Sequence, residues 1–331
     1  MHRFLAVLLL AACHLGAADQ PAPAATAPAP VPTVSVGVFV TSLYNIDFTS
    51  SQFTGQFWVW FVGAPKEFKP ATGVEVVNAK TQRVLASSHA DTPQGTWDQL
   101  KIEAQVHQRW DISAYPFDRQ VLVFNLESTD LDRSRLQFVP DVAGSRRSPE
   151  IALDGWRIED FRIRGEDQTY PTSYGDPTAG AAERSTFSRV VVEVELKREG
   201  WRLLFYTFLG FVLAIVLSSM VLTMNTTDYL VKTVPLAIRM TISTGALFAT
   251  VGAAYTLQSR LPTTTAFTLA DAIQGTAFIG TMCAVLASLG SETLVTNGDR
   301  TRGLRLGRIL FGLFAALLLA DVVLVLRAVA S

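Results

Sequence analysis

Six residues between Thr241 and Ser259 place small, hydroxylic or aromatic side chains inside an otherwise apolar segment. At ~100° per residue they fall within about 40° of one line on a helix. They are Thr241, Gly245, Phe248, Gly252, Tyr255 and Ser259. If several copies of this helix turn the stripe toward a common axis, hydroxyl groups near Thr241 hold water, and rings of Phe248 and Tyr255 form constrictions that close by dewetting. The alternative is that the small residues only let neighbouring membrane helices pack closely.

Residues for covalent or metal chemistry are scattered along the chain. The four histidines, His2, His14, His89 and His107, have no metal-ligand spacing. No glycine-rich phosphate loop, nucleophile elbow or paired His and carboxylate motif is present. The two cysteines, Cys13 and Cys283, lie too far apart in sequence to indicate a disulfide framework. We therefore expect no metal, no cofactor and no enzymatic activity.

The bulk composition indicates a membrane protein. Of 331 residues, 49% are hydrophobic and only 17% are charged, which is too apolar for an ordinary soluble domain. The formal net charge of −1 gives no basic surplus for binding a phosphate backbone. We therefore expect membrane lipid, and no nucleic acid, among the partners.

The N-terminal segment has the features of an export signal. A basic tip at His2 and Arg3 precedes an apolar run and then small residues, which predicts a signal peptide over residues 1–18. The sequence around Cys13 also resembles a lipoprotein cleavage box, so lipidation of this residue is the alternative. Residues 19–33 are almost entirely Pro and Ala, which predicts an extended tether.

Two structural units follow the tether. Between residues 34 and 198, short alternating runs such as VSVGVFV, FWVWFV and VVVEVEL are separated by Gly, Pro, Asp and Ser clusters. This pattern predicts an all-β, immunoglobulin-like sandwich. Residues 199–331 contain apolar stretches at 203–224, 235–257, 268–289 and 309–329, each near the ~20 residues that span a bilayer. We expect a transmembrane bundle of four helices.

The distribution of arginines predicts the orientation. The connection between the third and fourth stretches carries Arg300, Arg302, Arg305 and Arg308, whereas the connection before the third carries Arg260 alone. By the positive-inside rule the arginine-rich connection is cytoplasmic. The sandwich and the C-terminus are then outside.

The segment from Gln108 to Glu127, QRWDISAYPFDRQVLVFNLE, resembles the signature loop of the pentameric ligand-gated, or Cys-loop, receptor superfamily. The two loop cysteines of that family fall at Gln108 and Leu122, a substitution that matches bacterial members without the disulfide. Counting back from the Arg260-Leu261-Pro262 segment puts Arg239 at the basic inner position of the family's pore helix and Phe248 at its central gate. The resemblance extends over nearly the whole chain after the tether.

This resemblance implies a homopentamer in the bacterial inner membrane, with its sandwich and C-terminus in the periplasm. A small-molecule ligand would bind between adjacent sandwiches, and inorganic ions would cross the pore. Trp58 aligns with an aromatic residue of the complementary face, while Tyr170 and Tyr174 fall in the capping loop. The family usually has an aromatic residue at Thr129, so the aromatic box is incomplete. Glu127 either offsets that loss by pairing with an ammonium group, or is solvated or bound to a structural arginine.

The family pattern also implies a contact that couples the sandwich to the pore. Its members are Asp47, Pro116, Phe117, Asp118, Arg198 and Pro262. We expect Asp118 and Arg198 to form an ion pair in this contact. Binding of ligand to the open form would shift the population of a two-state pentamer.

Three questions stay open at this level. The inner end of the stripe lacks the Glu of cation-selective relatives, and Ala237 and Ile238 stand there instead, so ion selectivity is open. A receptor that binds ligand without conducting is the alternative function, because Phe248 and Tyr255 could seal the pore. Asp321, an ionisable residue within the fourth stretch, has no assigned role.

Overall fold

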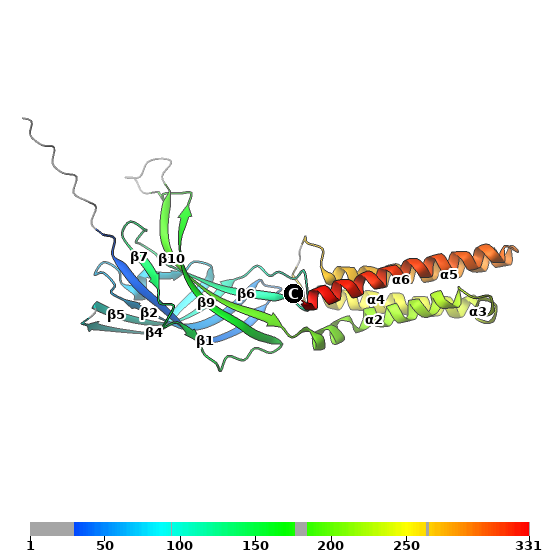
Figure 1. The fold of residues 1–331 in the computed structure, drawn as a ribbon, viewed down its shortest axis with the longest axis horizontal. Helices are drawn as coiled ribbons and strands as arrows, with labels where there is room; N and C mark the ends of the chain where they lie inside the picture. The colour runs from blue at the N-terminus through cyan, green and yellow to red at the C-terminus, as the bar shows by residue number, and fades with distance from the viewer. Residues whose placement is uncertain (1–29, 94, 176–183, 263–264, 331) are drawn as a thin grey trace, which may run out of the picture. The chain divides into compact units, whose positions relative to one another are not determined.

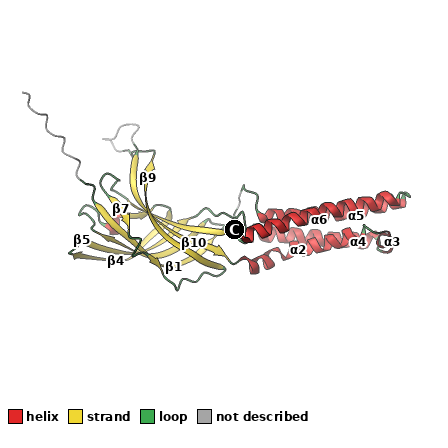
Figure 2. Ribbon diagram, viewed as in Figure 1, coloured by secondary structure: helices red, strands yellow, loops and turns green. Residues whose placement is uncertain are grey.

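The computed structural model describes residues 30–93, 95–175, 184–262 and 265–330, with strands in the first part and long helices in the second (Figures 1 and 2). The strands are β1 (Thr33–Asp47), β2 (Gln52–Val62), β3 (Val74–Val76), β4 (Ala79–Thr92), β5 (Gly95–His107), β6 (Arg119–Ser128), β7 (Gln137–Pro140), β8 (Arg146–Arg147), β9 (Trp156–Tyr170) and β10 (Ser185–Arg198). The helices are α1 (Pro70–Gly73), α2 (Gly200–Met224), α3 (Asp228–Thr233), α4 (Leu236–Gln258), α5 (Leu269–Thr296) and α6 (Arg300–Ala330). The expected signal peptide, with Cys13, lies outside the described residues, as does the expected tether up to residue 29.

The strands form two sheets. One has the order β4-β5-β2-β1-β7, with β8 also paired to β1, and the other has the order β3-β6-β10-β9. Most neighbours are antiparallel, while β7 and β8 run parallel to β1. The expectation of a β-sandwich over residues 34–198 is confirmed at this level.

The core between the sheets follows from alternation along the strands, because successive side chains point to opposite faces. Val190, Val192 and Val194 of β10 are fully buried. Across the gap, the rings of Phe57 on β2 and Phe124 on β6 lie 4.9 Å apart, so side chains of the two sheets interdigitate.

Four helices, α2, α4, α5 and α6, are long and apolar enough to cross a membrane, which indicates a multi-pass membrane protein. They run side by side in Figure 1, where α4 packs on α2 and α5, and α6 packs mainly on α5. At two close approaches a glycine is required. A Cβ at Gly280 of α5 would overlap the ring of Phe314 on α6, and one at Gly210 of α2 would lie 2.8 Å from the Cβ of Ala253 on α4.

The expected span limits are wrong at the end of the helices where α3 lies. The fourth stretch was expected from residue 309, but α6 begins at Arg300, so the arginines assigned to a connection form the first turns of a helix. The third stretch also continues, to Thr296. Apolarity located the spans but not these ends, because polar residues extend a helix once its apolar part is packed.

Candidate functional site

The polar and aromatic stripe lies on α4 and is exposed along its whole length. Its members, Thr241, Gly245, Phe248, Gly252, Tyr255 and the C-cap Ser259, are all exposed. Phe248 and Tyr255 expose 74% and 78% of their surfaces. The stripe therefore faces away from the described part of the chain, which leaves most of the surface of both rings uncovered.

The glycines of the stripe have no close-packing role among the described residues. A Cβ at Gly245 or Gly252 would meet no atom of these residues within 4 Å, in contrast to Gly210 and Gly280 at helix contacts. Close packing of helices inside the chain, the alternative interpretation of the small residues, therefore does not explain Gly245 and Gly252.

The opposite face of α4 is buried against α2 and α5. Its buried residues recur at helical spacing and are Arg239, Ser243, Ala246, Thr250 and Leu257. Threonine hydroxyls on both faces donate to carbonyl oxygens four residues earlier, as Thr241 Oγ1 does to Ala237 O at 2.9 Å and Thr250 Oγ1 to Ala246 O at 2.9 Å. No hydroxyl donor of these two threonines is left unpaired in an apolar environment.

Arg239 lies in the first turn of α4, but its side chain belongs to the buried face. Its guanidinium is fully buried and donates to Asn225 Oδ1 at 2.6 Å and to Glu292 Oε2 at 2.5 Å. Asn225 Nδ2 donates in turn to Ser288 Oγ at 3.2 Å. Because these residues come from the C-cap of α2, from α4 and from α5, the cluster ties three helices together rather than adding a charge to the exposed stripe.

A cavity of about 470 Å³ lies at the end of β6, beside the tips of β9 and β10. Its charged lining residues are Glu75, Glu127, Asp130, Asp132 and Arg135, and its aromatic ones are Tyr170, Tyr174 and Phe187. The three rings meet edge to face with centroids 5.9 to 6.2 Å apart. The structure thus brings together three of the four expected ligand residues, Glu127, Tyr170 and Tyr174.

Glu127 has protein partners of its own. Its carboxylate accepts from Arg189 Nε at 2.5 Å and from the Tyr170 hydroxyl at 3.1 Å, and it is almost fully buried. Burial and the neighbouring Glu127 carboxylate raise the pKa of Tyr170, which keeps its hydroxyl protonated as the donor. Of the two roles left open for Glu127, the pairing with an arginine is the one present.

The pocket also contains acidic residues that sequence reasoning missed. Glu75 of β3, together with Asp130 and Asp132 after β6, forms no ion pair among the described residues. Desolvation, with Glu127 and Asp130 as neighbouring carboxylates, raises the pKa of Glu75. The spacing of these acidic residues in the sequence did not indicate a shared pocket, because only the pairing of β3 with β6 brings Glu75 opposite Glu127.

Trp58 is not in this pocket. It lies half-exposed on β2 of the other sheet, with Lys101 Nζ 5.8 Å from its ring centroid. A single chain therefore carries Trp58 and the aromatic pocket on different sheets.

A row of alternating charges links the pocket to the opposite end of its sheet. From Arg189 the order is Glu166, Arg164, Glu193, Arg162, Glu195 and Arg119, each joined to the next by an ion pair. Apart from the shorter contact of Arg164 with Glu166, the N–O distances of these ion pairs are 3.2 to 3.5 Å. The row crosses between β9, β10 and β6, and ends one residue after Asp118.

The expected ion pair of Asp118 and Arg198 is present. Arg198 Nε donates to Asp118 Oδ1 at 2.6 Å and Nη2 donates to Oδ2 at 3.2 Å. The side chain of Asp118 is 1% exposed and that of Arg198 is 11% exposed. The guanidinium carbon also lies 3.9 Å from the ring centroid of Trp156, 4.6 Å from Phe48 and 5.1 Å from Tyr115.

The loop between β5 and β6 packs directly on the helices. Phe117 meets Trp201 of α2 edge to face at 5.1 Å, and a Cβ at Gly200 would overlap the carbonyl of Pro116. The amide of Leu269, the first residue of α5, donates to Ser113 O at 2.9 Å. Of the expected coupling residues, Pro116, Phe117, Asp118 and Arg198 therefore lie at the junction of sandwich and helices.

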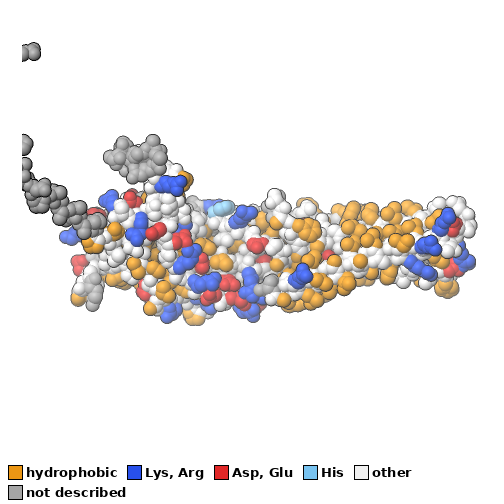
Figure 3. Space-filling view, turned by 45° about the horizontal axis from the view of Figure 1, so that its top comes forward, with side chains coloured by type: hydrophobic (Ala, Val, Ile, Leu, Met, Phe, Trp, Pro, Cys, Tyr) orange, Lys and Arg blue, Asp and Glu red, His pale blue; other side chains and the backbone are white. Residues whose placement is uncertain are grey.

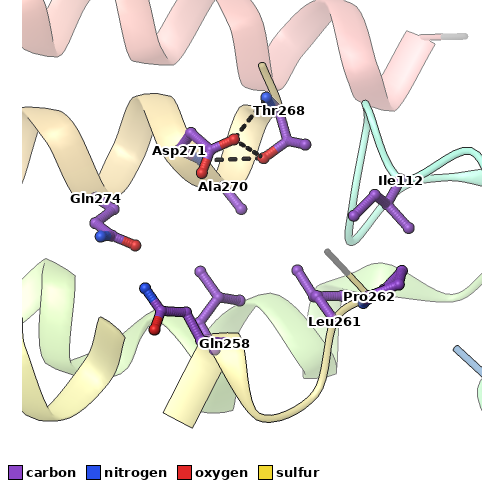
Figure 4. A pocket seen from close by; sticks show the side chains of 9 residues that line it. Ile112, Gln258, Leu261, Pro262, Thr268, Ala270, Asp271 and Gln274 are labelled. Atoms are coloured by element: carbon purple, nitrogen blue, oxygen red, sulfur yellow. Dashed lines mark hydrogen bonds between the residues drawn. The ribbon is translucent and has the colours of Figure 1, made fainter. Parts of the chain in front are cut away.

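Pro262 lines a second cavity, of about 530 Å³, at this junction. Figure 4 shows Ile112 of the β5–β6 loop on one side, with Gln258 and Gln274 reaching toward each other farther along the helices. Asp271 and Thr268 cap the start of α5 reciprocally, since Thr268 N donates to Asp271 Oδ2 at 2.8 Å and Asp271 N to Thr268 Oγ1 at 3.1 Å.

Asp47 contributes to the junction by holding the turn that follows β1. Its carboxylate accepts from Thr49 N at 2.8 Å, and its carbonyl accepts from Trp110 Nε1 at 3.0 Å. Hydrogen bonds from Ser50 and Thr49 lower the pKa of Asp47. Asp47 thus holds the turn that places Phe48 on Arg198.

Within the described part of the chain, no cluster of three His, Cys, Asp or Glu side chains is arranged to hold a metal ion. In comparisons with known proteins, no family model matches the chain and no curated protein matches it.

Proposed function

We propose that this chain is one subunit of a homopentameric ligand-gated ion channel, in which α4 lines the pore and the immunoglobulin-like sandwich binds a small ligand. The observation that carries the proposal is the stripe of α4. It runs the length of a helix that is long and apolar enough to span a membrane, consists of small, hydroxylic or aromatic residues, and is exposed throughout. Among the described residues, no atom lies within 4 Å of a Cβ placed at Gly245 or Gly252. If copies of α4 surrounded a common axis, this stripe would line a water-filled pore.

The contrast with α6 supports this assignment. The exposed residues of α6 include Ile309, Leu319 and Leu326, the composition of a surface that faces lipid. Of the four spans, α4 has the lowest mean hydropathy, 1.4, and α6 has the highest, 2.8. In the chain, α4 packs on α2 and α5, whereas α6 packs mainly on α5. The exposed side of α4 would face water in the pore, and the exposed side of α6 would face lipid.

The acidic and aromatic pocket is the proposed ligand site. Glu75, Asp130 and Asp132 supply negative charge, and the rings of Tyr170 and Tyr174 supply π faces, so a small organic cation fits its chemistry. Glu127 acts indirectly, by holding the Tyr170 hydroxyl. Trp58 of an adjacent subunit would complete the site.

Ligand binding would reach the pore through the Asp118–Arg198 junction. This contact joins β10, the β5–β6 loop and the start of α2, so a change in the sandwich moves the helix ends. The orientation that fits is a sandwich and C-terminus in the periplasm and the α3 end of the helices in the cytoplasm of a bacterial inner membrane.

Current through planar bilayers tests the proposal. Purified protein is reconstituted under a salt gradient while pH and small primary and quaternary amines are varied, and the reversal potential gives the selectivity. The variant Phe248→Ser removes the proposed hydrophobic gate, so we expect leak current or a response at lower amine concentration. Leu319→Ser, at a residue of α6 that is 67% exposed, is the matched control and leaves the current unchanged.

A receptor that binds ligand without conducting is the second candidate. Two large exposed rings on each α4, Phe248 and Tyr255, favour it, because ten such rings in a pentamer can seal a pore. Silence from both the native protein and Phe248→Ser, with amine binding retained, would support this receptor and exclude the channel.

A further inference from the structure

The first three turns of α6 carry an unusual concentration of positive charge. Arg300, Arg302, Arg305 and Arg308 lie in its first nine residues, and the first turn contains no acidic residue. The unpaired amides of a helix N-terminus already act as a partial positive charge. Arginines there are unfavourable unless an anion offsets them.

Among the described residues, carboxylates pair with only half of these arginines. Arg300 pairs with Asp228, and Arg302 pairs with Asp299 at 3.1 Å. Arg308 Nε donates to the backbone carbonyl of Thr226 at 3.2 Å, which fixes the side chain without neutralising it. Among the described residues, neither Arg305 nor Arg308 has a carboxylate partner.

Arg305 lies on the side of α6 that faces away from the other helices. At ~100° per residue, Arg302 and Arg308 lie within about 60° of Arg305 on either side. The buried residues of α6 lie roughly opposite Arg305 and are Gly303, Gly307, Phe314, Asp321 and Ala328. These three arginines therefore mark the middle of the exposed face.

The same exposed face continues as an apolar strip along α6. Ile309, Leu319, Val323 and Leu326 are 61%, 67%, 41% and 63% exposed. Figure 3 shows apolar side chains along the helices, and Lys and Arg side chains gathered at the end where α3 lies. One surface thus presents guanidinium groups at its end and an apolar strip beyond them.

We infer that Arg305 and Arg308 bind the headgroup of an anionic phospholipid whose acyl chains lie along this strip. Guanidinium groups donate paired hydrogen bonds to phosphate oxygens. A free phosphate would satisfy the arginines but not cover the apolar strip, so the surface fits a lipid better than an inorganic ion. This site is separate from the proposed pore and ligand pocket and does not require the chain to conduct.

Lipid binding by the full-length protein tests the inference. The protein, purified in neutral detergent, is mixed with phosphatidylglycerol or phosphatidylcholine, and bound lipid is counted by native mass spectrometry. The native protein should retain phosphatidylglycerol in preference to phosphatidylcholine. An arginine at a membrane surface contributes about fivefold to the affinity for anionic lipid, so R305Q/R308Q should bind phosphatidylglycerol about 25-fold more weakly.

The control is R327Q, which removes one exposed arginine from the last turn of α6. It should bind phosphatidylglycerol as the native protein does. If the double variant does not fold, R305Q carries the test with an expected loss of about fivefold. Arg305 makes no hydrogen bond or ion pair within the described residues, so its replacement leaves the fold intact.

Three results would overturn the inference. One is undiminished phosphatidylglycerol binding by the folded arginine variants. Another is an equal loss in R327Q and R305Q, which would indicate attraction by net charge alone. The third is displacement of the lipid by millimolar inorganic phosphate, which would indicate a site for the free ion.

Discussion

The variant Asp118→Asn tests the junction between the sandwich and the helices. It leaves the guanidinium of Arg198, 11% exposed in the native protein, without its counter-charge. Breaking a buried pair in this way costs about 3–5 kcal/mol of unfolding free energy. The rings of Trp156, Phe48 and Tyr115 still hold the cation, and each such contact contributes up to about 2 kcal/mol, so we expect a loss near 3 kcal/mol.

A double variant separates the charge from the packing. Asp118→Asn with Arg198→Met leaves no buried charge, and a methionine fills the space among the rings. Replacing a buried ion pair by well-packed groups is nearly neutral, so the double variant should lose only about 1 kcal/mol. It should therefore be more stable than Asp118→Asn alone.

Urea denaturation of the full-length protein in detergent, followed by tryptophan fluorescence, measures this difference. Trp156 reports directly, because its ring lies 3.9 Å from the guanidinium carbon. If the two substitutions add, so that the double variant is less stable than either single one, the reasoning from a buried charge is refuted. Arg198→Lys keeps the positive charge but loses the planar, forked guanidinium. The unfolding free energy of this variant should lie between those of the native protein and Asp118→Asn.

Gly280→Ala should destabilise the protein by about 1–3 kcal/mol in thermal melts because its Cβ overlaps the ring of Phe314, whereas Gly252→Ala, with no neighbouring atom within 4 Å, should not lower the melting temperature. The pKa of Glu75 is raised, so as pH falls toward it from neutral the pocket loses negative charge and the half-maximal concentration of a cationic ligand should rise. Glu75→Gln should flatten this dependence, and an unchanged pH profile would count against Glu75. Trp58→Ala should weaken the response to a quaternary amine about fivefold without changing the melting temperature, and equal responses would remove Trp58 from the site.

Strong periodic patterns predicted most of the fold. The alternating run of β10 and the apolar lengths of the helices located the sandwich and the four spans. The helix ends were wrong because Arg300 and Glu292 are polar, and apolarity alone does not distinguish a polar helical turn from a loop. The short helix α3 has too few residues for a periodic signal.

The candidate site was predicted in part. The exposed face of α4 follows from helical periodicity, whereas the pairing of Asp118 with Arg198 was implied by the family resemblance and not by the spacing of the charges. Glu75 was missed because it joins the pocket only through the register of β3 on β6. Arg189 was missed because an arginine on a strand has no sequence signal for the particular carboxylate it contacts.

The row of alternating charges on β9, β10 and β6 restricts how these strands can vary. Glu193 lies between Arg162 and Arg164, so a change of Glu193 to lysine would place three positive side chains in succession. Reversing one charge thus disturbs two neighbours, and exchanging Arg164 with Glu193 would set a glutamate beside Glu166 and an arginine beside Arg162. The sign of each side chain inside the row is consequently fixed by both of its neighbours, so charge-reversing substitutions are disfavoured singly and in adjacent pairs.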